Sequence, residues 1–352
     1  MPKEKAHLQF QKWSEENGPV YSLVLGMKVM VVLSSDQAIK DLLDKRSGIY
    51  SSRPEMYLGQ IISGGYRVLL MPCFCVDLIK AEEEQGFSEG IAGYTSGSLL
   101  EAGSDTTAAT LIGFVQALLI FPEVMTAAQA EIDRVCGERL PELDDLPNLP
   151  YIRGCIKESM RWMPTDILGV PHAVIRDDEY MGYKIPKGST MVYNVWAVQM
   201  DPKRHANPER FDPSRWLEDT QTSAEAATNA DATKRDHFVF GAGRRLCQGM
   251  HIADRSLFLA MSRLLWGFEF HRAVDDATGE EIVPAMHDLT EGLFVLPKPF
   301  QAKVVPRSEA KAARIRAEWA EMTELLDDEM QWKALPKGMI WDDDAALVGV
   351  EA

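Results

Sequence analysis

The spacing of apolar residues predicts a chain built mostly of helices, with a minority of short strands. Residues 5–17 have the pattern of an amphipathic helix that ends at Gly18-Pro19. Two runs rich in β-branched residues follow within 20–33, and the turn at Gly26 between them predicts a hairpin. A second helix is expected over 35–45, because it begins with Ser and Asp, which favour a helix N-terminus.

The remaining chain repeats this alternation of helical and strand-like patterns. Helices are predicted over about 89–121, 122–136, 148–162, 249–266 and 308–331, and short strands within 167–195 and 267–305. The last helix is charged, and one of its faces carries the apolar residues Ile315, Trp319, Met322 and Leu326. Residues 218–236 are polar, which predicts a surface loop. The fold class is therefore mainly α with minor β.

Composition and charge narrow the possible partners. The 352 residues include 37 Lys and Arg against 53 Asp and Glu, a net charge of −16, so we expect no nucleic-acid partner. The 5 cysteines have no framework spacing and follow no signal peptide, which predicts reduced thiols inside a cell. The longest apolar run, 111–121, is interrupted by Gln116, and a membrane span needs about 18 residues. We expect no transmembrane segment in this chain.

The segment from Phe240 to Gly249 is the strongest candidate for chemistry. Its glycines allow a tight loop whose backbone N–H groups converge on Cys247, just before a predicted helix. Converging amides and a helix N-terminus both favour a thiolate. Such a thiolate is either a nucleophile or a soft metal ligand, and the alternative is a buried structural cysteine in a glycine-rich turn.

Three shorter patterns accompany this loop. Glu158 and Arg161 lie three residues apart on a predicted helix, so that their charges share one face. Small and hydroxyl residues interrupt the long helix at 102–107, where a Thr hydroxyl can take a local backbone carbonyl and open the helical ladder. His172 follows a Gly-Val-Pro sequence. Taken singly, these patterns also suit a surface ion pair, helix packing and a structural histidine.

The string Phe-x-x-Gly-x-Arg-x-Cys-x-Gly over 240–249 resembles the haem-binding loop of cytochromes P-450, and the other patterns occur in that family's order. The resemblance implies haem b with Cys247 as the axial ligand of its iron. It also implies cofactor contacts from Arg245, His172, Phe240, Gly243 and Gly249. Asp105 and Thr106 would relay protons and hold the oxygen intermediate, and Glu158, Arg161 and Arg210 would form a buried ionic triad.

The resemblance is strongest to fungal cytochromes P-450 of secondary metabolism, similar to O-methylsterigmatocystin oxidoreductases. It implies a haem-dependent monooxygenase that inserts one oxygen atom from O₂ into a small apolar natural product. Electrons would come from an NADPH–cytochrome P-450 reductase. Family members are usually anchored to the endoplasmic reticulum; this chain starts without that anchor, so we expect it to be cytoplasmic or peripheral.

The sequence also departs from the family's pattern. Residues 1–305 correspond to the family's domain, and 306–352 form a charged helical extension. Only about 50 residues separate Arg53 from Gly103, where the fold usually has on the order of 150 more. We therefore expect a truncated cytochrome P-450 fold, with an internal helical block missing near 71–73. The alternative function is a non-catalytic remnant that binds haem weakly or not at all and acts as an interaction module.

Overall fold

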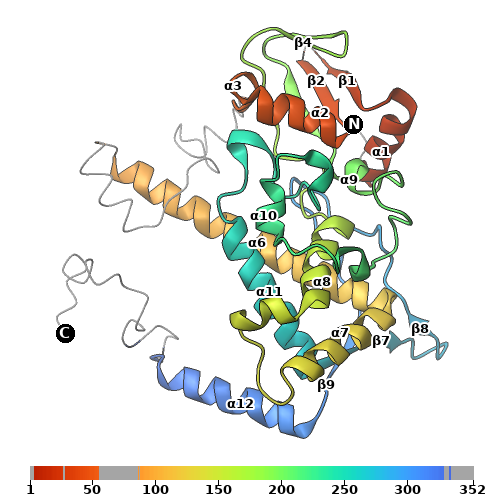
Figure 1. Cartoon of the computed structure of the whole chain (residues 1–352), viewed down its shortest axis with the longest axis vertical. Helices are drawn as coiled ribbons and strands as arrows, with labels where there is room; N and C mark the ends of the chain where they lie inside the picture. The colour runs from red at the N-terminus through yellow and green to blue at the C-terminus, as the bar shows by residue number, and fades with distance from the viewer. Residues whose placement is uncertain (1–3, 27, 55–85, 87, 329–332, 334–352) are drawn as a thin grey trace.

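The computed structural model describes residues 4–26, 28–54, 86, 88–328 and 333. The described elements form a smaller part rich in strands, near the N-terminus, and a larger helical part (Figure 1). The position from which a helical block is predicted to be missing, near 71–73, lies outside the described residues. The structure has the predicted balance of many helices and few short strands.

A four-stranded sheet joins the N-terminus to the middle of the chain. Helix α1 (Ala6–Asn17) leads into the hairpin of β1 (Val20–Leu25) and β2 (Lys28–Leu33), as predicted. Strand β6 (Thr190–Tyr193) pairs parallel to β2, and β3 (His172–Ala173) pairs antiparallel to β6. This topology brings His172 next to the segment around residue 50, over a large distance in sequence.

Four helices build the main core. They are α6 (Glu89–Ile120), α7 (Pro122–Val135), α8 (Pro150–Trp162) and α11 (Met250–Gly267), and each lies within about two residues of its predicted bounds. Proline occupies the first position of both α7 and α8, where its missing N–H costs nothing. Buried apolar side chains from all four helices form one continuous cluster. Helix α8 is buried along almost its whole length.

Helix α6 is buried only in its C-terminal half. Phe114 and Leu118 are fully buried, whereas Leu100 is 73% exposed. In Figure 1 the N-terminal part of α6 projects beyond the other described elements. Within the described residues, Gly97–Ile120 is the one helix long and apolar enough to cross a membrane, and 44% of that window is buried in the protein. This stretch is longer than the 111–121 run that the sequence suggests.

The segment 218–236 is only in part the expected surface loop, because exposed residues such as Glu218 and Lys234 lie among buried ones. It contains the short helix α10 (Ser223–Ala227), whose Ala224 and Ala226 are buried. Asp236 is also buried, and its carboxylate accepts a hydrogen bond from Ser223 at 3.0 Å. Small side chains allow this part of the segment to pack closely, and the polar composition did not reveal it.

Short elements complete the fold. The remaining helical turns are α2 (Asp36–Ile39), the π-helical η1 (Lys40–Lys45), α3 (Ser47–Tyr50), η2 (Leu143–Asn148), α9 (Val195–Gln199), η3 (Pro213–Trp216), η4 (Ala232–Lys234) and η5 (Gly243–Arg245). The remaining strands are β4 (Asp178–Tyr180), β5 (Tyr183–Ile185), β7 (Phe268–Val274), β8 (Glu281–Ile282) and β9 (Ala302–Pro306). The charged helix α12 (Glu309–Glu324) ends earlier than predicted, and Trp319 on its apolar face is exposed.

Candidate functional site

The glycine-rich loop before α11 is held against the N-terminal part of the chain. The carbonyl of Phe240 accepts a hydrogen bond from the N–H of Cys247 at 2.8 Å, which closes the loop. Gly241 and Gly243 have φ angles of 80° and 64°, a conformation that favours glycine. A Cβ atom on Gly243 would lie 1.9 Å from the carbonyl oxygen of Leu43, so the loop contacts η1 directly. Only glycine fits at position 243.

Cys247 ends this loop with its thiol exposed. The backbone N–H of Gly249 donates a hydrogen bond to the sulfur, which favours the thiolate. Protein atoms nevertheless surround much of the sulfur, and this desolvation raises the pKa of the Cys247 thiol. Desolvation and the Gly249 hydrogen bond act in opposite directions on the pKa of this thiol, so the thiolate stays a prediction. A cation bound at the sulfur would supply the missing stabilisation, because coordination to a metal deprotonates a thiol.

Two of the predicted cofactor contacts, His172 and Arg245, are hydrogen-bonded to neighbouring backbone carbonyls, those of residues 50 and 51. The Nδ1 of His172 donates to the carbonyl of Tyr50 at 2.6 Å, and the Nε of Arg245 donates to the carbonyl of Ser51 at 2.9 Å. Burial, together with the positive charge of Arg53 and Arg245, lowers the pKa of His172 to about 4. His172 is therefore neutral at pH 7, and its tautomer follows from the bond to Tyr50.

Arg53 joins this cluster, although sequence reasoning missed it. Its guanidinium donates to the carbonyls of Val170 and Pro171, both at 2.9 Å, just before His172. Its buried Nε has no hydrogen-bond partner among the described residues. A lone arginine in a segment without period carries no sequence signal of this role. The two arginines, Arg53 and Arg245, present donors and positive charge suited to an anionic group, and the single N–H of neutral His172 is already used by Tyr50.

The predicted ionic pair of α8 is present and fully buried. Arg161 donates to both carboxylate oxygens of Glu158, at 2.8 and 2.7 Å, and neither side chain is exposed. The same carboxylate accepts hydrogen bonds from the Nε of Arg215 at 3.3 Å and from the indole of Trp216 at 2.9 Å. Each lone pair of this buried carboxylate therefore has partners, which a buried charge requires.

Arg210 is not the third member of this group, contrary to the prediction. Its side chain forms an exposed ion pair with Glu123 at 2.9 Å, and only its backbone carbonyl accepts a bond from Arg161, at 3.2 Å. The helical turn η3 directs Arg215 towards α8 instead. Both arginines belong to the same meander five residues apart, and the local sequence does not decide which one turns inward.

The predicted oxygen-handling residues lie on the exposed half of α6. The hydroxyl of Thr106 donates to the carbonyl of Ala102 at 2.8 Å, as the sequence suggests, while Asp105 is exposed. Helix α6 nevertheless runs without interruption from Glu89 to Ile120, so the expected opening of its ladder is absent from this structure.

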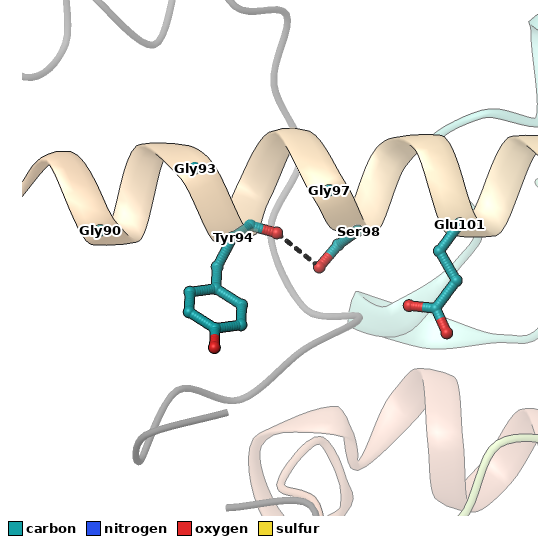
Figure 2. A pocket seen from close by; sticks show the side chains of 6 residues that line it. All are labelled: Gly90, Gly93, Tyr94, Gly97, Ser98 and Glu101. Atoms are coloured by element: carbon teal, nitrogen blue, oxygen red, sulfur yellow. Dashed lines mark hydrogen bonds between the residues drawn. The ribbon is translucent and has the colours of Figure 1, made fainter. Parts of the chain in front are cut away.

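An open cavity of about 500 Å³ lies along the same helix, one turn before Asp105. Figure 2 shows Tyr94, Ser98 and Glu101 projecting from one side of α6, with three glycines on neighbouring turns. The cavity is lined by Gly90, Gly93, Tyr94, Gly97, Ser98 and Glu101. Residues four apart share a helix face, so Glu101 and Asp105 follow one another along this side.

Comparisons with known proteins show the family to which the chain belongs. The family model Cytochrome P-450 matches residues 67–304. The chain is 45% identical over 490 residues to the cytochrome P-450 monooxygenase virE of Hypocrea virens, covering 97% of this chain and 89% of that protein. It is 39% identical over 494 residues to the cytochrome P-450 monooxygenase fogE of Aspergillus ruber, covering 99% and 91%.

The fold matches solved structures of the same family. A zebra fish cytochrome P-450 determined with abiraterone superposes with a TM-score of 0.70 and 21% sequence identity, over 86% of this chain and 99% of that one. Because that identity is low, it shows the mainly α fold alone, whereas the fungal relatives show the activity class. The chain belongs to the cytochrome P-450 family, and it is an oxidoreductase of the monooxygenase class, of the fungal secondary-metabolism type.

Proposed function

We propose that Cys247 is the sole axial protein ligand of a haem b iron, and that the chain inserts one oxygen atom from O₂ into a small apolar natural product. The observation that carries this proposal is the exposed Cys247 thiol at the end of a closed loop, beside the cluster of Arg53, His172 and Arg245. A soft thiolate ligand suits haem iron.

The residues present fit a haem. Its propionates are anionic, and the unpartnered Nε of Arg53 offers them a buried donor. Arg245 and the neutral His172 complete the polar side of the site. Gly249 leaves space next to the sulfur, since a Cβ there would lie 4.0 Å from it. When bound, the haem supplies the O₂ chemistry, and the protein binds and orients the reactants.

Thr106 and Asp105 of α6 would handle protons. The Thr106 hydroxyl is held by the carbonyl of Ala102, which fixes its oxygen on one face of α6. Asp105 is exposed one residue earlier, and its carboxylate would relay protons from water. Electrons come from a separate NADPH–cytochrome P-450 reductase, and the substrate enters from the open side of α6.

We also propose that an internal helical block is missing. The matches to virE and fogE extend over 490 and 494 residues, more than a third longer than this chain of 352. The N-terminal half of α6 is exposed, and its Leu100 is 73% exposed. An apolar surface of this kind is normally covered by other helices, which supports the proposal. This observation favours the second candidate, a remnant that holds haem weakly and does not complete the reaction.

The reduced, carbon-monoxide-bound absorption spectrum separates these functions. We expect a Soret band of the thiolate-ligated type from the purified chain, and its loss in Cys247→Ser. The matched control is Cys136→Ser, because that thiol is buried between α7 and η2 and contacts Asp145 instead. A Cys247→Ser chain that keeps the band contradicts the assignment. A wild-type chain that binds no haem establishes the remnant.

A further inference from the structure

A buried glutamine links the ionic pair of α8 to the loop that carries Cys247. Gln199 is the last residue of α9 and is fully buried. Its Nε2 donates to the carbonyls of Met160 and Arg161, at 3.0 and 2.8 Å. Its Oε1 accepts the backbone N–H of Phe238 at 2.9 Å. Both donors and the acceptor of the amide are therefore used at once.

The α8 side of this link is rigid. The carbonyls of Met160 and Arg161 belong to the last turn of α8, where a helix leaves carbonyls without internal partners. The side chain of Arg161 is itself clamped by Glu158, and its Nη1 returns a bond to the backbone carbonyl of Gln199 at 3.1 Å. The amide of Gln199 thus takes its position from a fully buried charge pair.

The other side of the link leads directly to the sulfur ligand. The carbonyl of Phe238 accepts the N–H of Gly241 at 3.0 Å, and the carbonyl of Phe240 accepts the N–H of Cys247 at 2.8 Å. A continuous series of hydrogen bonds and short backbone turns therefore connects Glu158 to Cys247, and Gln199 is the member at its centre. A side chain with only donors or only acceptors cannot make this connection.

We infer that Gln199 is a positioning residue for Cys247, which rests on the proposal that Cys247 binds haem iron. The amide fixes where the loop begins, relative to the ion pair, and so fixes the direction of the sulfur. Just before the loop, a second tie joins the buried Lys157 of α8 to the buried Asp236 at 3.4 Å. Because that tie remains when Gln199 is changed, we expect the loop to loosen locally while the chain stays folded.

The test compares Gln199→Met with a matched control, Gln129→Met. Gln129 is also a buried glutamine, in the middle of α7, and its Nε2 donates to the carbonyls of Leu265 and Phe268 at the end of α11, at 3.3 and 3.0 Å. Neither of these carbonyls belongs to the loop that carries Cys247. Methionine has a similar length and makes neither kind of bond, so Gln199→Met loses two donated bonds and one accepted bond, and Gln129→Met loses two donated bonds. A fall in Tm is therefore expected for both variants.

Two readouts separate positioning from mere stability. In the haem-loaded, reduced and carbon-monoxide-bound protein, we expect Gln199→Met to lower the thiolate-type share of the Soret absorption at least twofold. We also expect amide hydrogen exchange at Phe238 and Cys247 to accelerate at least tenfold. Gln129→Met should leave both unchanged. A Gln199→Met chain that behaves like Gln129→Met in both readouts overturns the inference.

The wild-type chain provides a test that needs no variant. At low denaturant, we expect the amides of Phe238, Gly241 and Cys247 to exchange as one cooperative unit with Met163, whose N–H is bonded in the last turn of α8. Exchange of Phe238 well before Met163 overturns the inference, even if Gln199→Met fails to fold. A wild-type chain without haem contradicts the proposed function, while this exchange experiment still tests the link.

Discussion

Glu158 accepts hydrogen bonds from two arginines, a tryptophan and a backbone N–H, and all of these donors point at one buried carboxylate. The loss of stability on removing a charged residue near Glu158 depends strongly on whether that residue is buried. Removing one partner of a buried charge leaves the other uncompensated, whereas an exposed ion pair contributes little. Arg161 belongs to the first kind and Arg210 to the second.

For that reason, Glu158→Ala is expected to lower the free energy of unfolding by about 3–5 kcal/mol and to abolish haem uptake. Arg210→Ala, the matched control, should cost less than about 1 kcal/mol, since its pair with Glu123 is solvent-exposed. Urea unfolding and the yield of soluble, haem-loaded protein measure both effects. Equal losses in the two variants would show that the meander depends on Arg210 after all.

The single glycine at position 243 sets how closely the loop approaches η1. Gly243→Ala adds a Cβ 1.9 Å from a backbone oxygen of Leu43, so the backbone must move, and we expect haem binding to be lost. Gly279→Ala is the control, because Gly279 has a similar φ of 71° but open space around it. The control should show only a strain of about 1 kcal/mol. Haem titration of both variants measures the effect on binding. Normal haem binding by Gly243→Ala would contradict the close contact between position 243 and Leu43.

At the scale of elements, α6 differs most from the rest of the molecule. Its C-terminal half packs in the core with α7, α8 and α11, while Leu99 and Leu100 in its N-terminal half face solvent. Each uncovered apolar Å² forgoes about 25 cal/mol of stabilisation. An open face also admits water to the side where Asp105 and Thr106 lie, and this water would compete with a substrate bound as proposed.

We therefore expect a haem-loaded chain to be poorly coupled. NADPH supplied through a reductase should be consumed mainly to form hydrogen peroxide, because the open face neither holds substrate nor excludes water. Grafting the helices of a full-length relative between residues 71 and 72 should raise the product formed per NADPH. The same graft in Cys247→Ser should form no product. Tight coupling in the ungrafted chain would mean that another surface, such as a second copy, closes the face.

At the scale of the whole molecule, buried neutral histidines control the response to acid. Burial lowers the pKa of His7 and His172 to about 4, and that of His205 to about 3. These groups have a pKa near 6.5 in the unfolded chain, so between pH 6.5 and 4 the unfolded state binds more protons. The native state consequently loses stability as the pH falls through this range.

In the chain without haem, each of these histidines should remove up to about 1.4 kcal/mol per pH unit near pH 5. Buried Asp166 has the opposite sign: its pKa is raised to about 7, mainly by desolvation, so its contribution falls as the pH rises from about 4 to 7. Urea midpoints between pH 4 and 7 measure the sum. His205→Asn should flatten the acid slope, and an unchanged slope would contradict a buried, neutral His205.

Much of the fold could be predicted from local patterns. Prolines and glycines mark the ends of α1, α7 and α8, and apolar periodicity predicts the length of α11, because these signals act between neighbours in sequence. The hairpin of β1 and β2 follows from its turn in the same way. Within the site, the loop of 240–249 and the Glu158–Arg161 pair could also be predicted from the sequence, since each is a short contiguous motif.

The sequence by itself therefore determined the family, the helical core and the candidate metal ligand Cys247. Only the tertiary structure decided that Arg215 turns inward instead of Arg210, that Arg53 bonds the backbone just before His172, and that part of 218–236 is buried. It also decided that Gln199 links α8 to the loop that carries Cys247. The physical reason is common to all of these cases. Whether a polar side chain is buried and satisfied depends on partners far away in sequence, and local pattern carries no information about them.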